Sequence, residues 1–149
     1  MDCEVHLHSP LYAEICARVS GINIVGIESA SHPDYLGLID KKMLEETDSF
    51  IRAGIARTDI LSMSAQLNER QGVNLWQDMP RLEREIMEME SPAVMKKRLE
   101  KAYDLFGERL RATGPDCGLG SWPGQDLAAR LLENCASAVR EFRSEKGMD

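Results

Sequence analysis

The sequence is poor in aromatic residues, in histidine and cysteine, and in long apolar segments. Aromatic side chains make up 5% of the 149 residues, and the chain has three histidines and four cysteines. No apolar run approaches the ~20 residues that a membrane-spanning helix needs. The start, MDCEVHLHSP, lacks the basic and apolar regions of a signal peptide. These absences favour a cytoplasmic protein without a membrane partner.

Positive charge is also scarce. The chain has 18 Lys and Arg against 25 Asp and Glu, a formal net charge of −7. This balance argues against a nucleic-acid partner, because the phosphate backbone attracts basic surfaces. The cysteines are too few and too scattered for a disulfide framework. We therefore expect free thiols or metal ligands at Cys3, Cys16, Cys117 and Cys135.

Short apolar strands alternate with amphipathic helices along the chain. The pattern predicts strands at residues 3–8, 21–28, 53–61 and 108–113, and a polar loop at residues 68–80. It predicts helices at residues 10–20, 36–51, 81–89 and 92–106, and a last helix after residue 124. The first helix has apolar residues at every fourth position, Leu11, Ile15 and Val19.

Two later helices carry a clear apolar face, and Met87 and Met95 are expected to belong to the core. The helix at residues 92–106 presents Met95, Leu99, Ala102, Tyr103 and Phe106, and the last helix presents Leu127, Leu131, Cys135, Ala138 and Phe142.

The order of elements predicts an α/β fold with four βα units in a single domain, residues 1–149. Crossovers of helical length imply parallel strands. Four βα units are half of a closed (β/α)8 TIM barrel, which needs ~250 residues. The domain is then either an open α/β sheet or a half-barrel that another chain, or the rest of a longer protein, completes.

Candidate metal ligands follow the first two strands. In His6-Leu7-His8, residues two apart on a strand point to the same face, so both imidazoles can reach one metal ion. Two hydrogen-bonded histidines at an exposed strand end are the alternative. Glu28 directly follows the apolar run INIVGI. It is a metal ligand, an acid with a shifted pKa, or one end of a salt bridge.

The third candidate is Cys117, in the glycine-rich turn GPDCGLGSW, although a lone cysteine is more often a buried apolar residue. With His6, His8 and Glu28 it offers nitrogen, oxygen and sulfur donors in tetrahedral number, which suits Zn²⁺. Iron and cobalt remain alternatives. Cys3 is a rival ligand, but strand alternation places it on the other face, so it ranks below His8.

The run GPDCGLGSW resembles the Asn-Pro-Asp-Cys-Gly-Leu turn of the cobalamin-independent methionine synthases, whose cysteine binds zinc. The His-x-Cys and Ile-Glu-Thr/Ser motifs of that family are similar to His6-Leu7-His8 and Ile27-Glu28-Ser29, in the same order. The final AVREFR is also similar. The resemblance spans essentially the whole chain, but only the C-terminal half of the family's catalytic barrel.

This resemblance implies a zinc-dependent methyltransferase in which a thiol such as homocysteine, activated as its zinc thiolate, accepts a methyl group from a methylfolate or methylcorrinoid. The implied zinc ligands are His6, His8, Glu28 and Cys117. There are two departures from the family. His8 stands where the family has cysteine, and the first four strands of the barrel have no counterpart.

The remaining site residues have weaker support. Asp59 and Asp116 are candidate catalytic or supporting residues, and Arg57, Ser29 and His32 are candidate substrate-binding residues. A mutual salt bridge between Arg57 and Asp59, and a surface helix start at His32, are the alternatives.

Two other functions are compatible with the pattern, a non-catalytic zinc-binding remnant or interaction module and a corrinoid-linked methyltransferase of the same superfamily. Because a half-barrel leaves unpaired strand edges, we expect a homo-oligomer or a partner half-barrel rather than a stable monomer.

Overall fold

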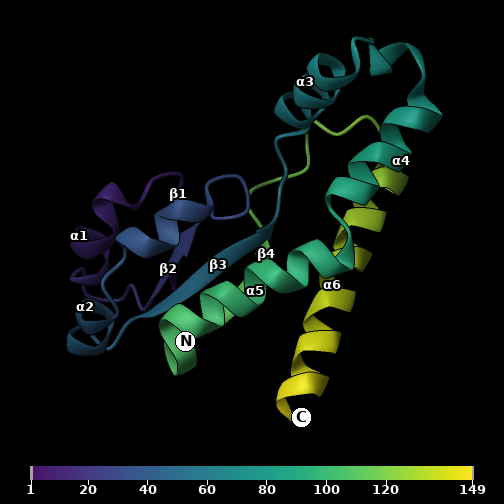
Figure 1. The fold of residues 1–149 in the computed structure, drawn as a ribbon. Coiled ribbons are helices and arrows are strands. Elements are labelled where there is room, and N and C mark those ends of the chain that lie inside the picture. Colours follow the sequence, from purple (N-terminus) through teal and green to yellow (C-terminus); the bar gives the residue numbers. More distant parts are fainter. Residues whose placement is uncertain (1, 149) are drawn as a thin grey trace.

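Four short strands form one parallel sheet in the computed structural model, which describes residues 2–148 (Figure 1). The strands are β1 (Glu4–Leu7), β2 (Ile24–Ile27), β3 (Phe50–Ala56) and β4 (Leu110–Pro115). They lie in the order β1-β2-β3-β4, and every neighbouring pair is parallel. The predicted α/β class and parallel sheet are therefore confirmed.

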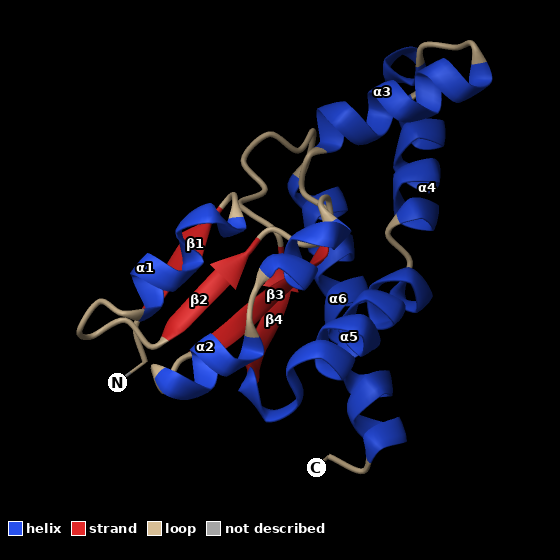
Figure 2. Ribbon diagram, turned by 60° about the vertical axis from the view of Figure 1, so that its left-hand side comes forward, coloured by secondary structure: helices blue, strands red, loops and turns tan. Residues whose placement is uncertain are grey.

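Six α-helices connect and cover the strands within the described residues (Figure 2). None of them is long and apolar enough to cross a membrane. Parallel strands in sequential order with right-handed crossovers place their connecting helices on one face of a sheet. The helices are α1 (Ala13–Ala17), α2 (Lys41–Glu46), α3 (Ile60–Gln71), α4 (Met79–Met89), α5 (Pro92–Phe106) and α6 (Gln125–Lys146).

The two faces of the sheet differ in character. Apolar strand residues, among them Val25, Ile27 and Ile51, pack in one cluster with Leu44 of α2 and Phe106 of α5. The alternate residues point the other way, as the two-residue period of a strand requires. They form a second face, called the polar face here because it carries the charged or polar residues Glu4, His6 and Arg52; its other residues include Ile24, Gly26, Phe50 and Gly54.

The polar face is concave. Arg52 on β3 reaches Glu4 on β1 across the strand between them, with Nε and Oε1 3.7 Å apart. Arg111 on β4 reaches Asp2, just before β1, with Nη2 and Oδ2 3.6 Å apart. Side chains of non-neighbouring strands can meet in this way when the sheet curls toward them.

The core predictions for the later helices are confirmed. All five residues expected to point inward from α6 are buried, from Leu127 to Phe142. Met95, Leu99, Ala102 and Phe106 of α5 are also buried, and Tyr103 is partly buried. Met87 and Met95 both belong to the cores, as expected.

The first predicted helix is shorter than expected, and its apolar face points outward. A 3-10 turn at Pro10–Tyr12 precedes α1, which ends at Ala17. Leu11, Ile15 and Val19 are 74%, 64% and 47% exposed, whereas Ala13 and Ala17 are buried against the sheet. The spacing of the larger residues was misleading because two alanines let the short helix approach the strands closely.

The predicted helix at residues 36–51 is wrong in both bounds. A 3-10 turn at Pro33–Leu38 comes first, and Asp40 then starts α2 by accepting a 2.9 Å hydrogen bond from the Lys42 backbone N–H. Asp48 takes the left-handed backbone conformation at φ 49°, and β3 begins at Phe50. These two aspartates divide the segment, because aspartate favours helix starts and turns.

The predicted strand at residues 53–61 and the predicted loop at residues 68–80 both exist, but their bounds are wrong, because the strand ends at residue 56 and the connection between α3 and α4 covers only residues 72–78. Strand β3 covers Phe50–Ala56, and α3 covers Ile60–Gln71. The buried residues Ile60, Met63, Ser64 and Leu67 have helical spacing, which the interpretation as a strand overlooked. The fourth strand starts at Leu110 rather than residue 108, because a 3-10 turn occupies Gly107–Arg109.

Candidate metal centre

Three of the four predicted metal ligands lie together at the carboxyl ends of the strands. His6 is on β1, Glu28 directly follows β2, and Cys117 lies in the turn after β4. One ligand atom from each lies within 4.8 Å of the other two, so the three form a group able to hold a cation. The strand order explains the proximity, because parallel strands bring their carboxyl ends to one edge of the sheet.

Glu28 lies between two imidazoles. His6 Nε2 is 3.0 Å from Glu28 Oε1, and His8 Nδ1 is 2.5 Å from Glu28 Oε2. The side chain of Glu28 is 12% exposed, against 36% for His6 and 75% for His8. His8 lies beyond the end of β1 and hydrogen-bonds the carboxylate, but it is outside the close group of three within the described residues.

The surroundings of Glu28 keep its carboxylate ionised. Burial raises the pKa of Glu28, but the hydrogen bonds from His6 and His8 outweigh burial and lower the pKa below its ordinary value. A carboxylate that is already ionised at neutral pH can bind a cation without first losing a proton.

Asp116 joins the turn that carries Cys117 to the turn that follows Glu28. It is 2% exposed, and its two carboxylate oxygens accept hydrogen bonds from the backbone N–H groups of Ala30 and Ser31, at 2.9 and 2.8 Å. The Ser31 hydroxyl donates a third, at 2.6 Å. Asp116 therefore holds the turn that carries Cys117 against the turn that follows Glu28.

A glycine and a serine complete this junction. A Cβ atom at Gly54 on β3 would overlap the Asp116 carboxylate. Because glycine has no side chain, the carboxylate fits at this position. Ser29, expected to bind substrate, is instead buried, and its hydroxyl donates to the Gly54 carbonyl at 2.8 Å. This contact fixes the residue after Glu28 to β3.

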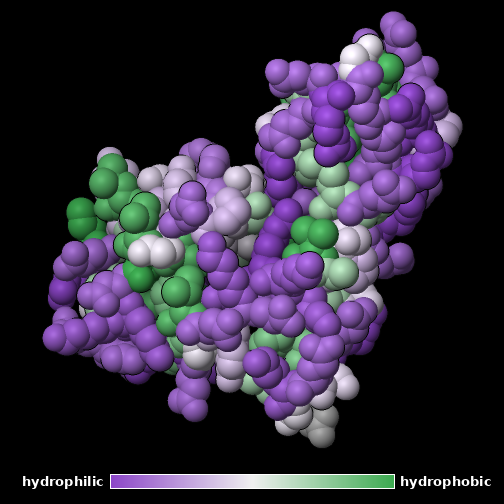
Figure 3. All heavy atoms as spheres, viewed as in Figure 1, coloured by the Kyte–Doolittle hydropathy of each residue, from purple (hydrophilic) through white to green (hydrophobic). Residues whose placement is uncertain are grey.

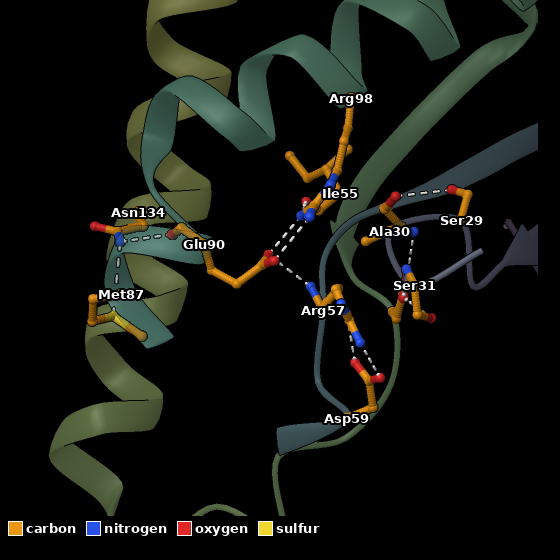
Figure 4. A network of polar contacts seen from close by, with 12 residues as sticks. Ser29, Ala30, Ser31, Ile55, Arg57, Asp59, Met87, Glu90, Arg98 and Asn134 are labelled. Carbon is orange, nitrogen blue, oxygen red and sulfur yellow. Dashed lines mark hydrogen bonds and ion pairs between the residues drawn. The ribbon is translucent and has the colours of Figure 1, made fainter. Parts of the chain in front are cut away.

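Arg57 and Asp59 bind each other, which was the alternative interpretation of this pair. Arg57 Nε and Nη2 donate to the two oxygens of Asp59, at 2.9 and 2.6 Å (Figure 4). Burial raises the pKa of Asp59, but the hydrogen bond from Arg57 and its positive charge lower the pKa overall. In the described part of the chain, no hydrogen bond links either residue to His6, Glu28 or Cys117.

His32 lies on the exposed side of the centre. Its ring stacks on Tyr35 with 4.6 Å between centroids and makes an edge contact with His8 at 5.9 Å. Two of the three histidines therefore hydrogen-bond Glu28, and the third packs against one of these two. Cys3, the rival ligand, precedes β1 and lies outside the group of three in the described residues.

Sequence reasoning missed Arg52, which supports the same turn from the concave face. Arg52 Nη2 donates to the Pro115 carbonyl at 2.5 Å, two residues before Cys117. A single arginine inside the apolar run FIRAGIA was a usable signal, but a strand predicted to start at residue 53 left it out.

An ion pair with a fully buried carboxylate was also missed. Glu90 is 0% exposed and accepts hydrogen bonds from Arg98 Nη1 and Nη2 and from the backbone of Arg57 (Figure 4). The pair links the start of α5 to the chain just after β3.

Comparisons with protein-family models, with curated proteins and with solved structures found no match to this chain.

Proposed function

We propose that this chain binds Zn²⁺ and is the zinc-binding half of a methyltransferase that transfers a methyl group to a thiol such as homocysteine, as in the cobalamin-independent methionine synthases. The observation that carries the proposal is the group of His6, Glu28 and Cys117, with ligand atoms within 4.8 Å of one another. Cys117 is exposed and therefore accessible to a metal ion and to a substrate.

The distances between the three ligand atoms and the charge of the three ligands both suit zinc. Zinc lies about 2.0–2.3 Å from nitrogen, oxygen and sulfur ligands, so tetrahedral ligand atoms are about 3.3–3.6 Å apart. The atoms present would need to move by about an ångström or less. A neutral histidine, a carboxylate and a thiolate balance the charge of Zn²⁺ before a substrate binds.

Three protein ligands leave one of four tetrahedral positions for a substrate, which is typical of catalytic rather than structural zinc. His8 was expected as the fourth ligand. Because it hydrogen-bonds the second oxygen of Glu28, we instead assign it to hold that carboxylate in place, and we assign the fourth position to the acceptor thiol.

Zinc bound here would lower the pKa of a coordinated thiol and so provide the nucleophile for methyl transfer. The protein residues supply the rest. Asp116 and Ser29 fix the turns that present Cys117 and Glu28, and His8 orients Glu28. Four free cysteines agree with a reducing compartment, so we place the reaction in the cytoplasm.

Zinc content and zinc affinity of the purified chain test the ligand set. We expect one zinc per chain. His6→Ala and Cys117→Ser should weaken affinity by more than the roughly 10- to 100-fold typical of a residue that only orients a ligand, whereas His8→Ala should fall within that range. Cys3→Ser is the matched control, because Cys3 is also an exposed thiol. Parental affinity in Cys117→Ser would remove the ligand assignment.

Methyl transfer to homocysteine, assayed with methylfolate and with methylcobalamin, tests the activity. Turnover that is lost in Cys117→Ser would support the proposal, and turnover with methylcobalamin alone would favour the corrinoid-linked alternative. A chain that binds zinc tightly but transfers no methyl group, even in a complete oligomer, would be a zinc-binding module.

A further inference from the structure

The two outer strands of the sheet are incompletely covered, unlike the inner ones. Every residue of β2 is buried, whereas every residue of β1 is exposed or half-buried, as are five of the six residues of β4. Parallel strands in proteins are usually buried on both faces. The sheet therefore has two open edges, at β1 and at β4, where a further parallel strand would complete its burial.

Apolar surface lies beside each open edge. Next to β1, Ile15 of helix α1 and Val19, two residues after the end of this helix, are exposed, and apolar residues gather on this end of the molecule (Figure 3). Next to β4, a groove of about 470 Å³ is lined mainly by apolar residues of β4, α5 and α6. Leu132 is 46% exposed on α6. Among the residues lining the groove are Leu99, Tyr103, Leu110, Ala112, Val139 and Phe142.

The two edges also carry opposite charge. Asp2 and Glu4 lie at the start of β1, and Arg109 and Arg111 lie at the start of β4. Parallel strands that pair side by side bring their starts together. A β1 edge is therefore complementary in charge to a β4 edge. Within one chain Asp2 already pairs with Arg111 at 3.6 Å, so the association of two copies exchanges this ion pair for one between the chains and does not add a new one.

We propose that two copies of this chain associate edge to edge, with β1 of each beside β4 of the other, into a closed eight-stranded parallel barrel. A curled four-stranded sheet in sequential order is half of such a barrel, and two chains of 149 residues together fall within the usual size range of the fold. Val5 and Leu7 of each β1 face the helix layer and enter the groove beside β4 of the other copy.

This arrangement has a functional consequence that does not depend on which metal binds. A two-fold axis along the barrel places both groups of His6, Glu28 and Cys117 at the same rim. The concave face, which carries Glu4, His6 and Arg52, becomes the interior of the barrel. Each centre is then enclosed by side chains of both copies, so the open fourth position faces a shared cavity.

The oligomeric mass of the full chain is the first test. Light scattering during size-exclusion chromatography should give twice the 16.7 kDa of one chain at micromolar concentration. A compact monomer would overturn the proposal, and so would a series of larger species, because these indicate a contact that does not close.

Surface variants test which faces meet. Ile15→Glu on the α1 side and Leu132→Glu on the α6 side should each weaken dimerisation at least about tenfold, since a charge replaces an apolar contact. Both positions are exposed in one chain, so the variants should keep the parental circular dichroism spectrum. Leu61→Glu is the matched control, because Leu61 is 66% exposed on α3, away from both edges. A dimer unaffected by both variants would refute this mode of pairing.

Hydrogen exchange gives an independent readout of the edge itself. The carbonyls of Cys3 and Leu7 accept hydrogen bonds from β2 and the residue after it. The backbone N–H groups of Glu4 and His6 therefore point to the open side of β1. These two amides should exchange slowly in the dimer and rapidly on dilution to monomer. Rapid exchange in the dimer would show that β1 is unpaired and would contradict the barrel.

Discussion

Asp116 and Ser31 are joined by two hydrogen bonds to one carboxylate oxygen, from the Ser31 backbone N–H and from its hydroxyl. This contact connects the carboxyl ends of β2 and β4, although the residues are 85 positions apart in the sequence. Glu28 precedes one end of the contact and Cys117 follows the other, so the separation of two proposed ligands depends on it.

We predict that Asp116→Ala lowers both stability and zinc affinity. The buried N–H of Ala30 and the partly buried N–H of Ser31 lose a charged acceptor, which should reduce the free energy of unfolding by about 2–3 kcal/mol. The freed turns should also weaken zinc binding by about 10- to 100-fold. Urea unfolding and competition with a zinc chelator measure the two effects. Asp104→Ala, at an exposed position on α5, is the control and should change neither. Parental zinc affinity in the Asp116→Ala chain would show that zinc binding does not depend on these hydrogen bonds.

We predict that zinc selectively protects Cys117 from alkylation. Cys3 and Cys117 are both exposed, whereas Cys135 is 6% exposed and burial raises the pKa of its thiol. Iodoacetamide should therefore label Cys3 and Cys117 quickly and Cys135 slowly, because the thiolate is the reactive form. Added zinc should slow only the labelling of Cys117, as followed by peptide mass spectrometry. Equal protection of Cys3 would indicate a non-specific effect of the metal.

We predict that Glu90→Ala is among the most destabilising single substitutions in this chain. Arg98 would lose the partner that accepts hydrogen bonds from both of its terminal nitrogens, and removal of one partner of a buried ion pair costs about 3–5 kcal/mol. Denaturant unfolding measures the loss, with Glu88→Ala, at an exposed position near the end of α4, as control. The double variant Glu90→Ala/Arg98→Met should be more stable than Glu90→Ala alone, because no unpaired charge remains.

We predict that the pairing of Asp59 with Arg57 makes stability depend on acid pH. The pKa of Asp59 is lower in the folded chain than its ordinary value of 3.8, so the pair contributes fully above that value. The contribution is lost as pH falls through the lower, folded pKa. Urea midpoints measured between about pH 6 and pH 2 should therefore fall less steeply in Asp59→Asn than in the parent. Identical slopes in the two proteins would show that the pair does not contribute.

Predictions from the sequence were most accurate where the local residue pattern agrees with the packing in the folded chain. The inward residues of α6 repeat every three or four positions over the length of the helix, and all of them are buried. Glu28 followed an apolar strand, and a carboxylate in that position needs a polar partner, which the two nearby histidines provide. In both cases the residues that determine the outcome lie on one element or on adjacent ones.

Prediction was poorer where long-range contacts or small residues determine the structure. The partners of Asp116 lie on another strand's turn, and no local pattern identifies them. Two alanines, rather than the larger Leu11 and Ile15, determine which face of α1 meets the sheet. The boundary between β3 and α3 was missed because Arg57 and Asp59 lie in a short connection between two apolar segments.

The three pairs of neighbouring strands are joined by loops of different length, so pairing them costs different amounts of chain entropy. Glu4 pairs with Ile24, 20 residues on, and Ile24 pairs with Phe50, 26 residues on. Ile51, in contrast, pairs with Leu110, 59 residues on, so closing this loop costs about 1 kcal/mol more than closing the first. The first of these closures is the one that brings His6 and Glu28 together, on neighbouring strands. Cys117 joins them only through the longest loop, so the third proposed ligand is the one whose placement costs the most chain entropy.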